Sequence, residues 1–185
     1  MSHPIPGYLH THERQGVFLG GTMITDHHGI PLDFKYTEPI RPTAVQKTIY
    51  GAVLHTYIRH HVLIGALARE AGVPPAFYIT AAANLEAAQE ASGLNLIALE
   101  RTQFASLVEK GSTSRAKENE CLIQGWNETH PMRVQFGTLP RGVQDPILQS
   151  LILLSRTMDV IEPLERLETA LERLCLEQMK QPAKT

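Results

Sequence analysis

Hydrophobic and polar positions are most regular between Gly16 and Gln46, where they predict a β-hairpin followed by a helix. Residues 17–25 form a β-rich run, and from Ile30 to Tyr36 apolar residues alternate with polar ones. A period of two residues is typical of a strand with one apolar face. The segment therefore predicts two adjacent antiparallel strands.

The turn of this hairpin is the polar sequence Asp26-His27-His28-Gly29. An aspartate bonds to nearby backbone, and a glycine accepts the positive φ that tight turns need. Within the first strand, the pair Gly20-Gly21 predicts a bulge or a place where another part of the chain packs closely.

After Pro39 and Pro42, apolar residues recur at helical spacing from Val45 to Leu67. Gly51 and Gly65 interrupt this pattern, so it fits two helices as well as one. Beyond Gly72, residues 76–80 and 94–99 are short apolar runs that flank an alanine-rich helical segment at 81–92. Strand, helix and strand at this spacing indicate a parallel β-α-β unit.

The remainder of the chain predicts a polar loop at 111–120 and two further strands at 121–126 and 132–136. Two helix starts follow, at Asp145-Pro146 and at Glu162-Pro163. Residues 1–15, with Pro4, Pro6 and Gly7, indicate an irregular N-terminal arm, and 16–180 a single domain.

Together these elements predict an α/β (or α+β) fold. It would contain an N-terminal β-hairpin, a long central helix region, one β-α-β unit, and a C-terminal helix hairpin packed on a mixed sheet.

Composition narrows the class of protein. With 185 residues and 43% hydrophobic residues, the chain is a globular protein of about one domain. Its net charge of −2 argues against a large electrostatic footprint for nucleic acid. The sequence shows no secretory leader and no long apolar run, and its two cysteines lack the spacing of a metal site. These features predict a cytoplasmic protein rather than a membrane protein.

Nine histidines raise the question of a metal site. His10 and His12 would share one face of a strand, but no histidine pair in the helical region has the spacing that brings two imidazoles onto one metal. A composite site of His10, His12, Asp26 and His28 forms only if the arm folds back on the hairpin. Solvent-exposed histidines are the simpler interpretation.

A phosphate or nucleotide site is expected where the strand 76–80 ends and the next helix begins, at Thr80, Ala81 and Asn84. The loop lacks glycine, so no glycine-rich nucleotide fingerprint is present, and Thr80 serves equally well as a simple helix cap. Lys35 and Arg41, near the end of the second strand, are further candidates for an anionic ligand, or else polar groups that bond locally.

No nucleophile motif or catalytic pair appears, and no cofactor is assigned. The leading hypothesis is a non-catalytic interaction or assembly subunit of a bacterial cytosolic complex. Its partner would be a second copy of the chain, giving a homo-oligomer, or another protein. Nucleic acid is an improbable partner. The alternatives are a small-molecule or nucleotide-binding protein, as an enzyme or not, with its site near Thr80, and a histidine-dependent metal site.

Overall fold

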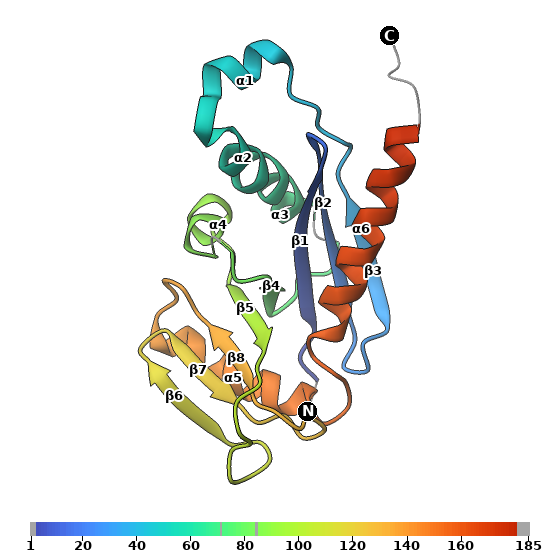
Figure 1. Cartoon of the computed structure of the whole chain (residues 1–185). Coiled ribbons are helices and arrows are strands. Elements are labelled where there is room, and N and C mark those ends of the chain that lie inside the picture. The colour runs from blue at the N-terminus through green and yellow to red at the C-terminus, as the bar shows by residue number, and fades with distance from the viewer. Residues whose placement is uncertain (1–2, 71, 84, 181–185) are drawn as a thin grey trace.

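An eight-stranded mixed sheet forms the centre of the computed structural model, which describes residues 3–70, 72–83 and 85–180. The strand order across the sheet is β3-β2-β1-β4-β5-β8-β7-β6 (Figure 1). The strands are β1 (Pro6–Arg14), β2 (Val17–Thr25), β3 (Pro31–Tyr36), β4 (Phe77–Thr80), β5 (Leu96–Arg101), β6 (Thr113–Lys117), β7 (Glu120–Ile123) and β8 (Met132–Gln135).

Helices cover both faces of this sheet. They are α1 (Ala44–Tyr50), the 3-10 turn η1 (Gly51–Val53), α2 (Leu54–Thr56), the π-helix η2 (Tyr57–Ile64), α3 (Gly65–Arg69), α4 (Leu85–Ser92), α5 (Arg141–Leu154) and α6 (Glu162–Lys180). The predicted α/β class, hairpin, central helix region and mixed sheet are confirmed. The β-α-β unit is also present, because β4 and β5 pair in parallel around α4.

The prediction of an irregular arm was wrong, because residues 6–14 form the strand β1. This strand pairs antiparallel with β2, from Gly7 opposite Ile24 to Arg14 opposite Val17, and parallel with β4, where Tyr8 lies opposite Ile79. Pro6 stands at the first position of the strand, where a missing amide hydrogen is tolerated. The segment is therefore a central strand of the sheet.

Strand alternation sends β1 side chains to two different cores. Tyr8 joins the large core that contains Leu167 and Leu171 of α6, and its hydroxyl donates a hydrogen bond to the Val160 carbonyl at 3.1 Å. Leu9 joins the core on the opposite face, which contains Ile64 of η2. Helices on both faces explain why β2 is buried along its whole length.

The glycine pair in β2 allows helices to pack closely on both faces. A Cβ at Gly20 would lie 3.0 Å from Leu67 Cδ1 and 3.1 Å from Leu63 Cβ, on the η2 and α3 side. A Cβ at Gly21 would lie 2.8 Å from Leu171 Cδ2 of α6. The predicted close packing is confirmed, whereas the register shift between β2 and β3 falls at Ile24 and Thr25 rather than at the glycines.

The segment from α1 to α3, residues 44–69, is a helical arm that turns twice along its length (Figure 1). Gly51, with a positive φ of 53°, ends α1, as expected of a glycine that interrupts helical periodicity. The segment then returns over the sheet as the π-helix η2 and α3, so Gly65 continues the helix instead of ending it.

Two other predictions need correction. Residues 111–120 include most of a β-hairpin, because β6 pairs antiparallel with β7 despite its polar, exposed side chains. Helix α5 begins at Arg141 after Pro140 and not at Asp145, so Pro146 lies inside its first turns. Helix α6 packs on β1 and β2, while α5 lies at the β6–β8 end of the molecule (Figure 1), so the two helices cover different parts of the sheet.

Across the described residues, none of the helices has both the length and the apolar character that crossing a membrane requires.

Candidate functional site

Strand β4 pairs in parallel with the first half of β1 and ends at Thr80, beside the middle of that strand, and η2 packs next to β1. A polar cleft of about 70 Å³ lies where these elements meet. Ligands of open α/β sheets commonly bind outside the carboxyl ends of the strands. The lining residues are Leu9, His10 and Thr11 of β1, Arg59, His60 and Ile64 of η2, Thr80, Ala81 and Ala83 at and after the end of β4, and Ala88 of α4.

His60 is the most deeply buried polar side chain of this cleft, with 4% of its surface exposed. Its Nδ1 has no hydrogen-bond partner among the described residues. Burial lowers the pKa of His60 below its ordinary value, and the neighbouring positive charges of His61 and Arg59 lower it further. A neutral imidazole with a free nitrogen is thus held against the cleft, where it can bond to a ligand.

Arg59 contributes the fixed positive charge. Its Nε is buried and also lacks a partner among the residues that the structure describes. Its Nη2 lies 3.9 Å from Glu13 Oε2 of β1, which is long for an ion pair. Most of the guanidinium donors therefore remain available to an oxyanion.

Arg59 and His60 both come from the π-helix η2. A π-helix closes its hydrogen bonds over five residues and is a rare conformation that occurs frequently at functional sites. Over Tyr57–Ile64 the buried residues are Ile58, His60, Leu63 and Ile64. The π-helix thus places a histidine among apolar residues on the side that packs against the sheet.

The side chains of His10 and His12 of β1 belong to the other face, although His10 also borders the cleft. Because residues alternate along a strand, they share the side of Tyr8 and approach α6. Burial lowers the pKa of His10, an effect that the negative charge of Glu168 on α6 opposes. The Nε2 atom of His12 is buried without a partner among the described residues.

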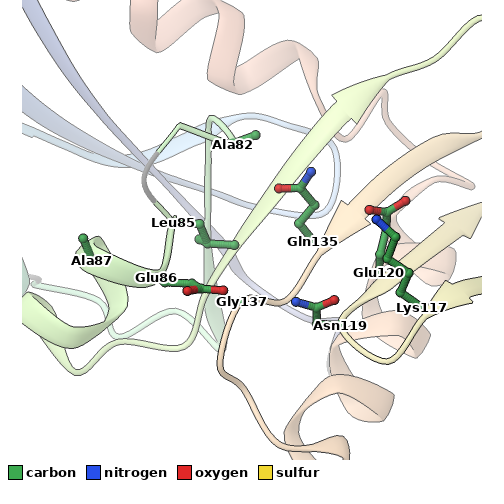
Figure 2. A pocket seen from close by; sticks show the side chains of 9 residues that line it. All are labelled: Ala82, Leu85, Glu86, Ala87, Lys117, Asn119, Glu120, Gln135 and Gly137. Carbon is green, nitrogen blue, oxygen red and sulfur yellow. The ribbon is translucent and has the colours of Figure 1, made fainter.

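A larger pocket of about 540 Å³ lies between the loop and helix that follow β4 and the strands β6, β7 and β8 (Figure 2). Lys117, Asn119 and Glu120 approach it from the β6–β7 turn, and Gln135 from β8. Its amide and charged groups can form hydrogen bonds with a polar ligand. Ala82 of the loop after β4 lines this pocket, while its neighbours Ala81 and Ala83 line the cleft.

The structure brings together only part of the predicted phosphate site. Thr80 and Ala81 line the cleft, while Asn84 lies outside the described residues. Thr80 does not cap the following helix, because α4 begins five residues later, at Leu85. Lys35 instead donates to the Glu70 carbonyl, and Arg41 donates to the Gln178 carbonyl at 2.8 Å, so these two side chains have local structural roles.

The four residues of the predicted metal site are not brought together. His10 and His12 lie opposite Gly21 and Leu19 of β2, whereas Asp26 and His28 belong to the turn beyond Thr25, at the other end of the strands. Asp26 there accepts hydrogen bonds from the backbone amides of His28 and Ile30, which lower its pKa. Nowhere in the described part of the chain do three or more His, Cys, Asp or Glu residues form a group able to hold a metal ion.

Sequence reasoning missed Arg59, His60 and Thr11. Their roles depend on β1 being a central strand and on the π-helical turn, neither of which hydrophobic periodicity revealed. One signal was available: from Thr43 to Arg69 the sequence contains Lys47, Arg59 and Arg69 but no acidic residue.

Comparison with known proteins gave matches at the level of structure. No protein-family model matches the sequence, and no curated protein matches it. Endonuclease V from Streptomyces avermitilis superposes with a TM-score of 0.65 at 13% identity, over 96% of this chain and 84% of that one. The Bacillus subtilis endonuclease V gives a TM-score of 0.56 at 13% identity, over 94% and 81% of the two chains.

A Ciona intestinalis endonuclease V, in complex with a 24mer DNA containing an inosine followed by a ribo-adenosine, gives a TM-score of 0.55 at 8% identity. The superposition covers 96% of this chain and 87% of that one. Identities this low establish a common fold.

These matches correct two predictions. The hypothesis of a non-catalytic assembly subunit was wrong, because the fold along nearly the whole chain is that of a group of nucleases. The expectation of a homo-oligomer or protein partner, with nucleic acid improbable, was also wrong, since the Ciona intestinalis protein of this fold is seen with DNA. The chain has an endonuclease V-like fold built on an eight-stranded mixed sheet.

Proposed function

We propose that this protein binds nucleic acid, and that a backbone phosphate occupies the cleft between β1, η2 and the end of β4. The observation that carries the proposal is the pair of unpartnered buried nitrogens, Arg59 Nε and His60 Nδ1, on two adjacent residues of this cleft. Buried polar groups normally find hydrogen-bond partners, so such a pair favours a ligand that accepts hydrogen bonds. A phosphate oxygen meets this requirement and neutralises the arginine charge.

The charge of the helical arm supports a polyanionic ligand. Residues 43–69 carry three fixed positive charges and no negative ones, although the chain as a whole has a net charge of −2. A local basic segment of this kind attracts a nucleic-acid backbone and raises the rate of encounter. The net charge of the whole chain, on which the argument against nucleic acid rested, does not reveal this local excess of positive charge.

The fold likeness supports the same proposal. The three endonuclease V structures match over at least 94% of this chain, and one of them holds DNA. Fold alone does not determine function, which depends on the residues of the site. The likeness in fold therefore supports nucleic acid as the class of ligand. The residues of the cleft support contact through a backbone phosphate.

Metal-assisted hydrolysis does not fit the residues present. Nucleases that use two metal ions hold them with oxygen ligands, chiefly carboxylates. The cleft is lined by histidine, arginine, threonine and apolar residues, and no metal-binding group of three or more donors occurs within residues 3–70, 72–83 and 85–180. The proposal is therefore recognition of nucleic acid through its phosphates, without a metal ion held by this chain.

A cytoplasmic location is part of the proposal. Cys121 and Cys175 are buried free thiols, a state expected in a reducing compartment.

Fluorescence anisotropy tests the proposed function. Labelled 20-nucleotide single strands and duplexes of DNA and RNA are titrated with the wild-type protein and with Arg59→Ala. We expect Arg59→Ala to weaken binding about tenfold or more and to reduce the slope of log K against log salt by about one. Arg173→Ala is the matched control, because it removes one positive charge from an exposed position of α6.

The absence of binding to every oligonucleotide would refute the proposal. Equal losses of affinity in Arg59→Ala and Arg173→Ala would show that only net charge matters, and the cleft would then not be the phosphate site.

A further inference from the structure

Three aromatic side chains follow one side of the helical arm and contact one another. The ring centroids of Tyr50 and Tyr57 are 5.0 Å apart with planes inclined by 31°, and those of Tyr57 and His61 are 5.5 Å apart with planes inclined by 26°. All three side chains are exposed, with 38% and 40% of the two tyrosine surfaces accessible. We call Tyr50, Tyr57 and His61 the aromatic ladder.

The outer part of this arm, helix α1, packs on none of the strands of the sheet in a way that buries its side chains. Helix α1 contains no buried residue at all, and Val45 and Ile49 expose 66% and 75% of their surfaces. Figure 1 shows α1 standing away from the sheet, connected to it through η2 and α3. An apolar and aromatic surface of this kind is unusual unless it binds something.

The charges of the residues around the aromatic ladder indicate the class of ligand that it binds. The ladder lies within residues 43–69, which carry Lys47, Arg59 and Arg69 and no acidic residue. Aromatic rings interleaved with positive charges are the combination by which proteins hold unpaired nucleotides, with bases on the rings and phosphates beside the cations. Tyr57 and His61 of the ladder belong to the same π-helix as Arg59 and His60, which line the cleft.

We propose that the aromatic ladder stacks unpaired nucleobases, so that the protein selects single-stranded nucleic acid over duplex. This inference rests on the proposed function and specifies its substrate. In a duplex the base faces are covered by neighbouring base pairs, whereas in a single strand they are free to stack on Tyr50 and Tyr57. The phosphate in the cleft then fixes the position of the strand relative to the ladder.

The test measures binding to one sequence in two forms, a labelled single strand and its duplex, for wild type, Tyr57→Leu and Tyr57→Phe. Stacking on an aromatic side chain predicts that Tyr57→Leu weakens single-strand binding by about fivefold to about a hundredfold, with duplex binding unchanged. Tyr57→Phe keeps the ring and should bind like the wild type. Tyr36→Leu is the control, since Tyr36 is an exposed tyrosine (51%) on the edge strand β3 and also lies beside another ring.

A second readout separates stacking from a general loss of surface. A single strand carrying 2-aminopurine should lose fluorescence on binding the wild type and keep more of it when bound to a Tyr50→Leu, Tyr57→Leu double variant at saturation. Because both tyrosines are exposed, thermal melting should show that the variants remain folded.

Each outcome leads to a different conclusion. If wild type binds neither form, the proposed function itself fails. If wild type binds but Tyr57→Leu binds both forms as tightly as before, or loses both equally, the ladder proposal is overturned while phosphate binding in the cleft stands.

Discussion

Arg59 of η2 and Glu13 of β1 form a loose ion pair in which Nη2 and Oε2 are 3.9 Å apart. The contact joins the helical arm to the central strand at the edge where the cleft lies. A phosphate that approaches Arg59 must compete with this carboxylate and is repelled by its charge. The pair therefore sets part of the affinity for an anion.

Removal of the Glu13 charge should strengthen nucleic-acid binding. A partly exposed ion pair contributes roughly 0.2–1 kcal/mol, so Glu13→Gln should raise the affinity by up to about fivefold. Anisotropy titration at fixed salt measures this change. Glu172→Gln provides the comparison, because Glu172 of α6 pairs with Arg14 of β1 at 3.1 Å, and its removal should have a smaller effect. A weaker complex with Glu13→Gln would show that the ion pair supports the binding conformation instead of competing with the ligand.

Binding should strengthen as the pH falls from 8 to 6. The pKa of His60 lies below 6.5 in the free protein because burial and the charges of Arg59 and His61 disfavour the imidazolium. A bound phosphate favours the imidazolium, so the complex takes up a proton and its affinity increases on acidification. Isothermal titration in buffers of different ionisation enthalpy counts the protons taken up.

The variant His60→Gln isolates this contribution, because the other histidines of the chain remain in place. It should bind with a flatter pH profile and take up fewer protons. An unchanged profile would exclude His60 from the phosphate site. Without ligand, the lowered folded-state pKa has the opposite consequence: the unfolded chain binds more protons, so His60 reduces stability as the pH falls below about 6.5.

Helix packing on β2 should tolerate no side chain at the glycine pair. In Gly21→Ala the new Cβ would lie 2.8 Å from Leu171 Cδ2, and in Gly20→Ala it would lie 3.1 Å from Leu63 Cβ, which cannot move without its helix. Each substitution should reduce the free energy of unfolding by about 1–3 kcal/mol, as measured by chemical denaturation.

The control for this prediction is Gly142→Ala in α5, where a Cβ meets nothing within 4 Å. Alanine is favoured over glycine in a helix, so this variant should be as stable as the wild type or up to about 1 kcal/mol more stable. Equal behaviour of the three variants would contradict the close packing of η2 and α6 against the glycines.

Chelation should leave binding unchanged. Because the described residues contain no group of three or more His, Cys, Asp or Glu that could hold a metal ion, EDTA should alter neither the affinity for oligonucleotides nor the thermal melting temperature. Titration with Mg²⁺ or Mn²⁺ should weaken binding only as much as an equal ionic strength of another divalent salt. A complex that requires a divalent ion at low concentration would contradict the metal-free account.

Local sequence signals predicted much of the fold. The alternation from Ile30 to Tyr36, the turn at Asp26–Gly29 and the helix start at Glu162 all correspond to observed elements. The strand β1 escaped detection because its apolar residues, such as Tyr8 and Leu9, occupy only its first half, and because its pairing with β4 joins residues about 70 positions apart. The hairpin β6–β7 escaped because its first strand is an exposed polar edge.

The candidate site was predicted only in part, because some of its features depend on contacts between distant parts of the chain. The end of a buried strand is readable from sequence, so Thr80 and Ala81 were found. Arg59 and His60 were not, because a helical wheel with 100° per residue does not describe a π-helix, and the burial of His60 follows from contacts that only the assembled sheet provides.

The most direct test of the central claim is nuclear magnetic resonance of the histidine side chains, labelled with ¹⁵N, during titration with a single-stranded oligonucleotide. The His60 signals are assigned by their loss in His60→Gln. We predict that they shift saturably with the binding curve, towards the imidazolium form, while the signals of His130, in the turn before β8, stay unchanged. Binding that leaves the His60 signals in place would contradict a phosphate site in the cleft.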